Sequence, residues 1–262
     1  MTITIINDCR DANAAGRQVT RAASLFDCPV SFIGVANDLE AAGNLIDALD
    51  AIEGKNEGII LVNVAPRHGI AKKWANGTPF GYFRHNNTLV VASIDGFTLS
   101  LVKKLQIVNA VHVLDISTVV NEMAAAGELS QGHIGYIAAS QFRSFDFLPR
   151  IAAFLVKRKR LTSTELKIGE IPDAPKAVWW IDNFGNCKTT ILPEEMNDAP
   201  NGKKETKFGA LSYIPQLKAV ADATPALIIG SSGIGEKRFL EIIVQGGNAA
   251  SHFNIHSGDC VL

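Results

Sequence analysis

Residues 1–160 alternate short apolar runs with amphipathic stretches, and this alternation is the feature that most limits the possible folds. Strands that alternate with helices favour a mostly parallel sheet covered by helices on both faces. We therefore expect an α/β fold whose N-terminal part, residues 1–163, is an α/β/α domain. The predicted strands are 2–6, 30–35, 58–64, 88–92 and 111–114, and the predicted helices are 11–25, 147–157 and two that end at Leu49 and Ala125.

The pattern changes after Arg160. Residues 164–176 hold two prolines and show no clear period, so we interpret them as a linker. Beyond them come short apolar runs separated by turn residues, which predict a smaller C-terminal all-β, barrel-like domain over 177–262. Its predicted strands are 178–181, 187–191, 226–229 and 239–244, followed by a short helix at 248–253.

The charge pattern argues against some classes of partner. The formal net charge is −1, and the basic run 157–160 ends a predicted helix, where cations suit the helix dipole. A nucleic-acid-binding surface is therefore not expected. No apolar run approaches the roughly 20 residues that a membrane helix needs, so we expect no membrane partner either.

The cysteines and histidines do not predict a metal site. The four cysteines (Cys9, Cys28, Cys187 and Cys260) have no metal-ligand or disulfide spacing, and His85, His112, His133, His252 and His256 have no ligand partners at metal spacing. This cysteine usage is typical of reduced thiols in a cytoplasmic protein. We therefore expect a cytoplasmic protein that acts on a small molecule without a metal.

Polar residues follow three of the predicted parallel strands, where ligands of open α/β sheets gather. Asp8 follows the first strand, and its carboxylate can accept two hydrogen bonds from the hydroxyls of a ribose. Asp8 can equally cap the next helix, and a cap is the preferred interpretation of Asp11. Asp95, after the fourth strand, can contact a ligand or cap a helix. Other predicted helix caps are Asn37 or Asp38, and Ser117.

The segment 181–186 combines a carboxylate, an aromatic ring and an amide in a few positions. Asp182, Phe184 and Asn186 follow an apolar strand, and together they suit a small polar ligand with an aromatic ring. A plain turn is the alternative, because Asn, Gly and Asp are ordinary turn residues.

Five motifs in fixed order relate this chain to a known family. They are Ile181–Asn186, Thr189–Ile191, Gly230–Gly233, Leu240–Ala250 and Gly258–Val261. On these motifs the chain resembles the S-adenosyl-L-methionine (SAM) hydroxide adenosyltransferases, or SAM hydrolases, which are relatives of fluorinase and chlorinase. Motifs in this order over about eighty residues are far more specific than any one alone.

The N-terminal part departs from the family pattern at the residues that prepare water for attack. The family uses an Asp–Arg–His set, and the corresponding positions here are Ala65, Lys72 and Arg143. Of the family's opening motif only Asp8 remains, and Ser93–Gly96 stands where the family has a Pro-Asp-Asn-Gly segment. The chain thus resembles a divergent member of the family, in which more of the ligand-binding residues are retained than of the residues that activate water.

The resemblance implies displacement at the ribose C5′ of SAM by water or hydroxide, giving adenosine and L-methionine without a cofactor. It also implies a homotrimer with ligand sites between subunits. The roles it implies are Asp8 on the ribose, Asp182 on the methionine ammonium, Phe184 against the adenosine, Asn186 on the adenine edge, and Ser231 and Ser232, with nearby backbone N–H groups, on the carboxylate. For the serines the alternative is a plain turn whose hydroxyls are hydrogen-bonded. Asp95, which only its place at a strand end suggests, is the further predicted ligand contact.

The identity of the residue that activates the nucleophile is a separate hypothesis. His68 lies in the loop that replaces the family's acidic one and can act as a base near neutral pH. Lys72 or Arg143 would then hold hydroxide electrostatically. The alternative for His68 is an ordinary surface-loop histidine.

Two rival functions stay open. Loss of the family's Asp and His suits a non-catalytic protein that binds SAM or adenosine. The cations Arg67, Lys72 and Arg143 suit a halide-dependent, halogenase-like adenosyl transferase.

Overall fold

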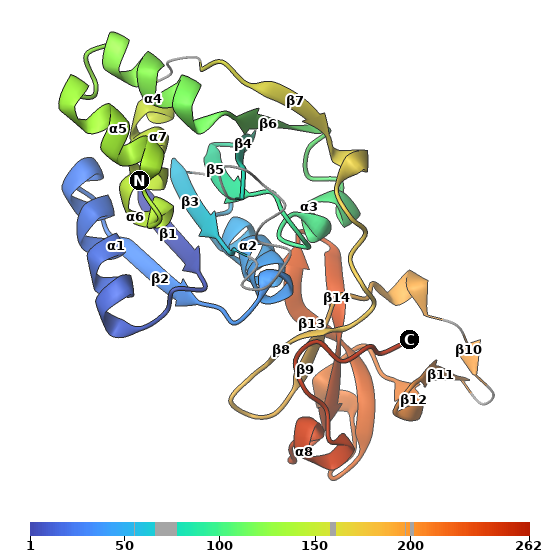
Figure 1. Cartoon of the computed structure of the whole chain (residues 1–262). Coiled ribbons are helices and arrows are strands. Elements are labelled where there is room, and N and C mark those ends of the chain that lie inside the picture. Colours follow the sequence, from blue (N-terminus) through green and yellow to red (C-terminus); the bar gives the residue numbers. More distant parts are fainter. Residues whose placement is uncertain (55, 66–77, 158–160, 197, 200–201) are drawn as a thin grey trace. The chain divides into compact units, whose positions relative to one another are not determined.

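The structure, a computed structural model, describes residues 1–54, 56–65, 78–157, 161–196, 198–199 and 202–262 (Figure 1). The chain divides into two compact units, Met1–Pro172 and Asp173–Leu262. Each unit has its own sheet, and each is described here by itself. No helix in the described ranges is long and apolar enough to cross a membrane.

A seven-stranded sheet forms the first unit, in the order β2-β1-β3-β5-β4-β6-β7. The strands are β1 Thr2–Asn7, β2 Val30–Gly34, β3 Gly58–Asn63, β4 Phe80–His85, β5 Thr88–Ser93, β6 Ala110–Leu114 and β7 Thr164–Lys167. β2, β1, β3 and β5 pair in parallel, whereas β4 and β7 run antiparallel to their neighbours. The predicted α/β fold with a mostly parallel sheet is confirmed.

Helices cover both faces of this sheet (Figure 1). They are α1 Ala12–Phe26, α2 Asp38–Ile52, α3 Ser100–Lys104, α4 Ile116–Ala125, α5 Gln131–Ala139, α6 Arg143–Asp146 and α7 Leu148–Val156. Ile59 and Leu61 of β3 pack into one core with α1 and α7, while their neighbours Ile60 and Val62 are buried on the other face. Because successive side chains of a strand point to opposite faces, β3 is apolar throughout its length.

Two strands of the first sheet were not expected from the sequence. β4 was not predicted, and β7 lies at 164–167, inside the segment that we interpreted as a linker. β7 pairs antiparallel with β6. Most of its side chains are exposed, so its pairing rests on backbone hydrogen bonds that a hydropathy pattern does not reveal.

The predicted N-caps of α1 and α2 are confirmed, whereas the predicted N-cap of α4 is wrong. The Asp11 carboxylate caps α1 by accepting from the N–H groups of Asn13 and Ala14, and Asn37 caps α2, both as expected. Ser117 is not the cap of α4. That helix begins earlier, and Asp115 caps it by accepting from the Thr118 N–H at 2.8 Å. These hydrogen bonds stabilise the carboxylate and lower the pKa of Asp115.

The second unit is a sheet in the order β10-β11-β12-β13-β14-β9-β8. Its strands are β8 Val178–Ile181, β9 Cys187–Thr189, β10 Asp198–Ala199, β11 Lys203–Thr206, β12 Gly209–Tyr213, β13 Pro225–Ile234 and β14 Lys237–Val244, and one helix follows, α8 Ala249–Phe253. The predicted all-β character is confirmed. β10, β11 and β12 were not predicted, and within the described residues the strand order ends at β10 and β8 without the barrel-like closure that we expected.

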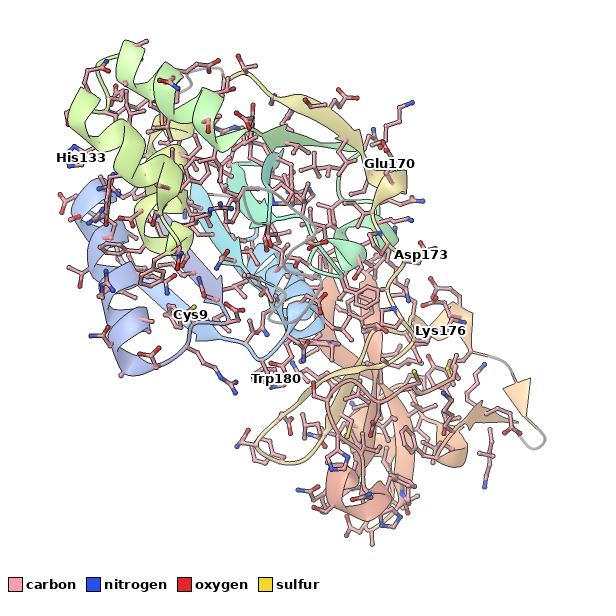
Figure 2. The ribbon with its side chains drawn as sticks, viewed as in Figure 1. Cys9, His133, Glu170, Asp173, Lys176 and Trp180 are labelled. Atoms are coloured by element: carbon pink, nitrogen blue, oxygen red, sulfur yellow. The ribbon has the colours of Figure 1, made fainter. Side chains whose placement is uncertain are left out.

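A buried amide pair fixes the carboxyl end of β1 to α1. The Asn7 Nδ2 donates to the Gln18 Oε1 at 2.7 Å, and the Gln18 Nε2 donates to the Ala14 carbonyl at 3.2 Å. Both side chains are essentially inaccessible to water. Asn7 also accepts from the Cys9 N–H at 2.8 Å, so the pair sets the path of the chain after β1. Figure 2 labels Cys9 in this segment.

Replacing Gln18→Ala is expected to lower the free energy of unfolding by about 1–3 kcal/mol, because the buried Asn7 amide loses its acceptor. Urea denaturation measures the change. Thr20→Ala, at an exposed position of the same helix, is the control and should change the midpoint little. Equal effects of the two substitutions would contradict the structural role of the amide pair.

Candidate functional site

In the first unit, the carboxyl ends of the parallel strands are held together by side chains. The half-buried Asp8 Oδ2 accepts from the Ala65 N–H at 3.3 Å, and the Ser93 Oγ accepts from the Val64 N–H at 3.1 Å. Asp8 does not cap α1, since Asp11 does. The segments that follow β1, β3 and β5 therefore meet at one edge of the sheet, with Asp8 among them.

Asp95 belongs to the turn that follows β5. Its Oδ1 accepts from the Gly96 N–H at 3.1 Å, while α3 begins only at Ser100 and has Leu99 at its cap position. The cap interpretation of Asp95 is therefore wrong. Asp38 also contributes to this turn, because its Oδ2 accepts from the Phe97 N–H at 2.7 Å. Asp95 is half-buried, and its contact with a ligand stays a prediction.

Arg143 is the one predicted catalytic residue whose position the structure describes. It begins α6, is half-buried, and its Nη1 donates to the Thr78 carbonyl at 3.4 Å. Burial lowers the pKa of Arg143, but a guanidinium keeps its charge in proteins. His68 and Lys72 lie outside the described residues, so their placement stays a prediction, as does that of Arg67.

In the second unit, the segment 181–186 forms a turn built around the Asp182 carboxylate. Oδ1 accepts from the N–H groups of Phe184 and Asn186, each at 2.9 Å, and Oδ2 accepts from the Asn186 Nδ2 at 3.0 Å. A carboxylate has about four acceptor positions, so roughly one position on Oδ2 is left for a ligand. The carboxylate therefore fixes both the backbone of the turn and the orientation of the Asn186 amide.

The same turn exposes an aromatic ring. The Phe184 side chain is 68% exposed, whereas the neighbouring Gly185 is buried with a φ of +84°. A Cβ at Gly185 would lie 2.1 Å from the Asn248 side chain, and the Gly185 carbonyl accepts from the Ala250 N–H of α8. Glycine lets the turn approach α8 closely, and the adjacent ring is left on the surface.

The two serines of β13 have different environments. Ser231 is exposed, and its N–H donates to the Glu241 Oε1 at 3.3 Å. Ser232 is buried, and its Oγ accepts from the Lys188 Nζ at 2.8 Å. The pairing of β13 with β14 shifts register between residues 229 and 233, so the serines lie at an irregular part of the strand.

Lys188 is a candidate site residue that the sequence did not suggest. It lies on β9 opposite Glu241 of β14, and its Nζ lies 5.7 Å from the centroid of the Trp179 ring. Its position directly after Cys187, between two family motifs, was the available signal. A lysine beside Ser232 provides a positive charge that the serines lack.

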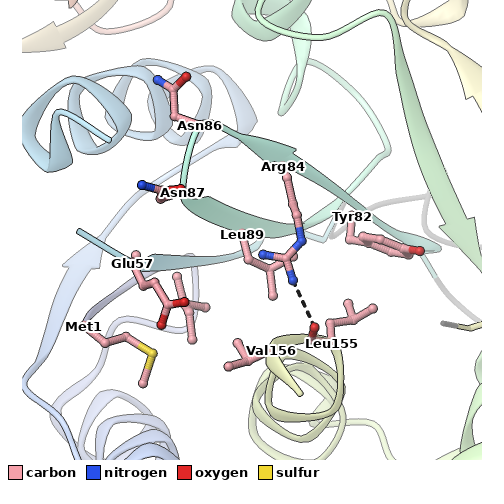
Figure 3. Close-up of a pocket in the computed structure, with 11 residues that line it drawn as sticks. Met1, Glu57, Tyr82, Arg84, Asn86, Asn87, Leu89, Leu155 and Val156 are labelled. Atoms are coloured by element: carbon pink, nitrogen blue, oxygen red, sulfur yellow. Dashed lines mark hydrogen bonds between the residues drawn. The ribbon is translucent and has the colours of Figure 1, made fainter. Parts of the chain in front are cut away.

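A separate pocket of about 420 Å³ lies at the opposite edge of the first sheet, at the amino ends of the parallel strands (Figure 3). Glu57, Arg84 and Asn87 line it, and the Arg84 Nη2 donates to the Leu155 carbonyl at the end of α7 at 2.9 Å. None of the predicted site residues that the structure describes lines this pocket. Among the described residues, no three His, Cys, Asp or Glu side chains are grouped as a metal site.

Burial raises the pKa of the Cys187 thiol to about 12, and the negative charges of Asp182, Asp259 and Glu241 add to the effect. The unfolded thiol ionises near its ordinary value of 9.0. The folded protein therefore keeps this proton where the unfolded chain loses it. Its contribution to stability is complete below pH 9.0 and is lost as the pH rises toward about 12.

Iodoacetamide applied to the native protein near pH 9.0 is expected to label the exposed Cys260 and to leave Cys187 unmodified, because alkylation requires the thiolate. Peptide mass spectrometry measures the labelling, and denatured protein serves as the control in which both cysteines react. Comparable native labelling rates at the two cysteines would contradict the raised pKa.

Comparison with known proteins agrees with the motifs of the second unit. Residues 176–262 match the sequence model of the SAM hydroxide adenosyltransferase C-terminal domain, which confirms the resemblance for this part of the chain. No curated protein gives a significant match.

Two solved structures share the fold over nearly the whole chain. An uncharacterized conserved protein from Thermotoga maritima is 15% identical, with 98% of this chain and 97% of that chain covered and a TM-score of 0.65. A conserved hypothetical protein from Thermus thermophilus is 17% identical, with 100% of this chain and 99% of that chain covered and a TM-score of 0.56. At these identities the likeness concerns the fold alone.

Proposed function

Because the C-terminal domain of this chain belongs to the SAM hydroxide adenosyltransferase C-terminal domain family, we propose that the protein is a SAM hydrolase. Water or hydroxide would attack the ribose C5′, a C–O bond would form as the C–S bond breaks, and adenosine and L-methionine would leave. The single observation that carries this proposal is the turn at 181–186, which exposes an aromatic ring beside an oriented amide.

The adenosine is recognised by Phe184 and Asn186. The exposed Phe184 ring offers a face on which a purine can stack. The Asn186 Nδ2 is held by Asp182, so the Asn186 Oδ1 is oriented as an acceptor for an amino group such as that of adenine. One carboxylate thus fixes the Asn186 amide and the backbone of Phe184, and the ligand meets a partly preformed surface.

The amino-acid end of SAM uses Asp182, Ser231, Ser232 and Lys188. The acceptor position left on the Asp182 Oδ2 suits the methionine ammonium. Lys188 adds a cation for the methionine carboxylate, next to Ser232. The exposed Ser231 hydroxyl completes this group. Lys188 therefore takes a part of the role that the resemblance gave to the serines.

The ribose is held by the first unit. Asp8 accepts from the ribose hydroxyls at the carboxyl edge of the parallel strands, where one of its oxygens already accepts from the Ala65 N–H. Asp95, in the turn after β5, contributes a second carboxylate at a neighbouring strand end. A homotrimer with sites shared between subunits is part of the same proposal.

The chemical step needs positioning more than activation, because a sulfonium is already a good leaving group. Ala65 has only a methyl group where the family has an aspartate, so that position provides no base. Arg143 stays protonated and stabilises a hydroxide or a developing negative charge without taking a proton. His68 is the proposed base, with Lys72 as a second cation.

A halide-dependent adenosyl transferase is the second candidate, and the positive charge of Arg143 favours it as well. Arg143 is half-buried and charged at the position where the family has a histidine, which suits an anionic nucleophile as well as hydroxide. A protein that binds SAM or adenosine without turnover is the third possibility, suggested by Ala65.

Incubation of the full chain with SAM, with and without chloride, distinguishes these functions when the products are separated by liquid chromatography. Adenosine supports the hydrolase, and a 5′-chlorinated nucleoside supports the transferase. Binding in calorimetry without either product supports the non-catalytic protein. Absence of both binding and product would overturn the proposal.

Phe184→Ala is expected to weaken the binding of adenosine by about tenfold, because stacking of a base on an aromatic ring contributes about 1–3 kcal/mol. Calorimetry with adenosine measures the affinity. Leu217→Ala removes another exposed apolar side chain of the same unit, 46% exposed, and should leave the affinity unchanged. Equal affinities of the wild type and Phe184→Ala would exclude the proposed stacking.

Arg143→Gln is expected to lower kcat by about 100-fold with little change in SAM affinity, because it removes a charge that acts on the nucleophile rather than on the bound ligand. Stopped assays of adenosine release measure kcat. His68→Ala tests the base: unchanged turnover would remove His68 from the mechanism. A loss of SAM affinity with unchanged kcat in Arg143→Gln would instead make Arg143 a binding residue.

A further inference from the structure

The outward side of α1 carries an open surface pocket of about 470 Å³. Gly16, Arg17, Thr20 and Arg21 of α1 line it together with Phe145 of α6. All of these residues belong to the first unit, in which α1 packs against α6 and α7 (Figure 1). The predicted site residues are not among those that line the pocket, so the function proposed above does not account for it.

Two guanidinium groups are held on one aromatic ring at this pocket. The Arg17 Cζ lies 4.6 Å and the Arg21 Cζ lies 4.1 Å from the centroid of the Phe145 ring. Arg17 also lies 4.9 Å from the centroid of Phe142, which stacks on Phe145. The attraction of each cation for the rings fixes both arginines in place.

A third guanidinium, that of Arg150 on α7, interacts electrostatically with Arg21. Its Nη1 donates to the Asp146 carbonyl at 2.7 Å. Burial lowers the pKa of Arg150, and repulsion by the Arg21 charge lowers it further, while Asp146 and Tyr136 act in the opposite direction. Asp146 is one buried carboxylate, and its Oδ2 accepts from the Ser140 hydroxyl. The three arginines therefore keep an excess of positive charge.

One N–H donor of Arg21 is buried and makes no hydrogen bond within the described residues. Within the described part of the chain, the Arg21 Nη1 is shielded from water and has no hydrogen-bond partner. A buried donor on a charged group costs free energy when it is left unpaired. Repulsion between the charges of Arg21 and Arg150 adds to that cost. An anionic ligand would accept a hydrogen bond from the buried donor and would also reduce the repulsion.

A glycine also lines the pocket. Gly16 lies inside α1, where glycine is less favourable than alanine. A Cβ at Gly16 would meet nothing within 4 Å, so packing does not require glycine there. The missing side chain instead leaves room at the lining of the pocket.

We propose that Arg17 and Arg21, which both lie on the Phe145 ring, form a binding site for a phosphate-bearing small molecule, with Arg150 adding positive charge from α7. Guanidinium forks match the geometry of phosphate oxygens, and a phosphate monoester carries a charge of about −1.5 to −2, which suits a pair of neighbouring cations. The Thr20 hydroxyl adds a neutral donor at the lining. Nucleic acid fits less well, because guanidinium groups already occupy the Phe145 ring on which a base would stack.

Calorimetry of the full chain with inorganic pyrophosphate tests the site. Arg17→Gln and Arg21→Gln are each expected to weaken binding at least about tenfold, and Arg21→Lys to fall between them and the wild type, because lysine keeps the charge but loses the fork. Lys218→Gln removes one exposed positive charge in the other unit and should bind as the wild type does. Thermal unfolding of each variant shows that it is folded.

Gly16 provides a second, independent test. Gly16→Ala is expected to raise the melting temperature and to retain pyrophosphate binding, whereas Gly16→Leu should fill the pocket and weaken binding about tenfold or more. Equal binding by the wild type, both arginine variants and Gly16→Leu would overturn the proposal, as would no response to millimolar pyrophosphate. Binding of duplex DNA without any response to pyrophosphate would overturn the assignment to a small molecule.

Discussion

The constraint on which this structure depends is that backbone N–H groups must find acceptors where strands end. Inside a sheet the neighbouring strand supplies them, but at a strand end a side chain must take over. Here those acceptors are Asn7 for Cys9, Ser93 for Val64, and Asp182 for Phe184 and Asn186. The residues that close the strand ends are therefore also residues that shape the candidate site.

These hydrogen bonds order the candidate site without a ligand. Asp182 fixes the backbone of the turn that carries Phe184 and orients the Asn186 amide, and roughly one acceptor position of its carboxylate is left. Preorganised groups need not be ordered on binding, which lowers the entropic cost of recognition. The chemistry that the family performs on SAM requires such positioning, because its leaving group is already reactive.

Positive charge recurs in the first unit in places where the family pattern or the sequence gives little hint of it. Arg143 stays charged beside the Thr78 carbonyl. Arg17 and Arg21 of α1 lie on the Phe145 ring of α6, which is distant from them along the chain, and Arg150 of α7 interacts electrostatically with Arg21.

The sequence alone determined the α/β fold, the all-β character of the second unit and the caps Asp11 and Asn37, because periodicity and capping are local properties. It also identified the Asp182 turn, whose residues lie within six positions. The cap at Asp115 is equally local, and Ser117 was predicted instead only because the predicted start of the helix lies too late. Only the tertiary structure decided the pairing of β4 and β7, the contact of Lys188 with Ser232 and the packing of Arg17 and Arg21 on Phe145. These depend on contacts between segments that are distant in sequence, and no local pattern encodes such distances.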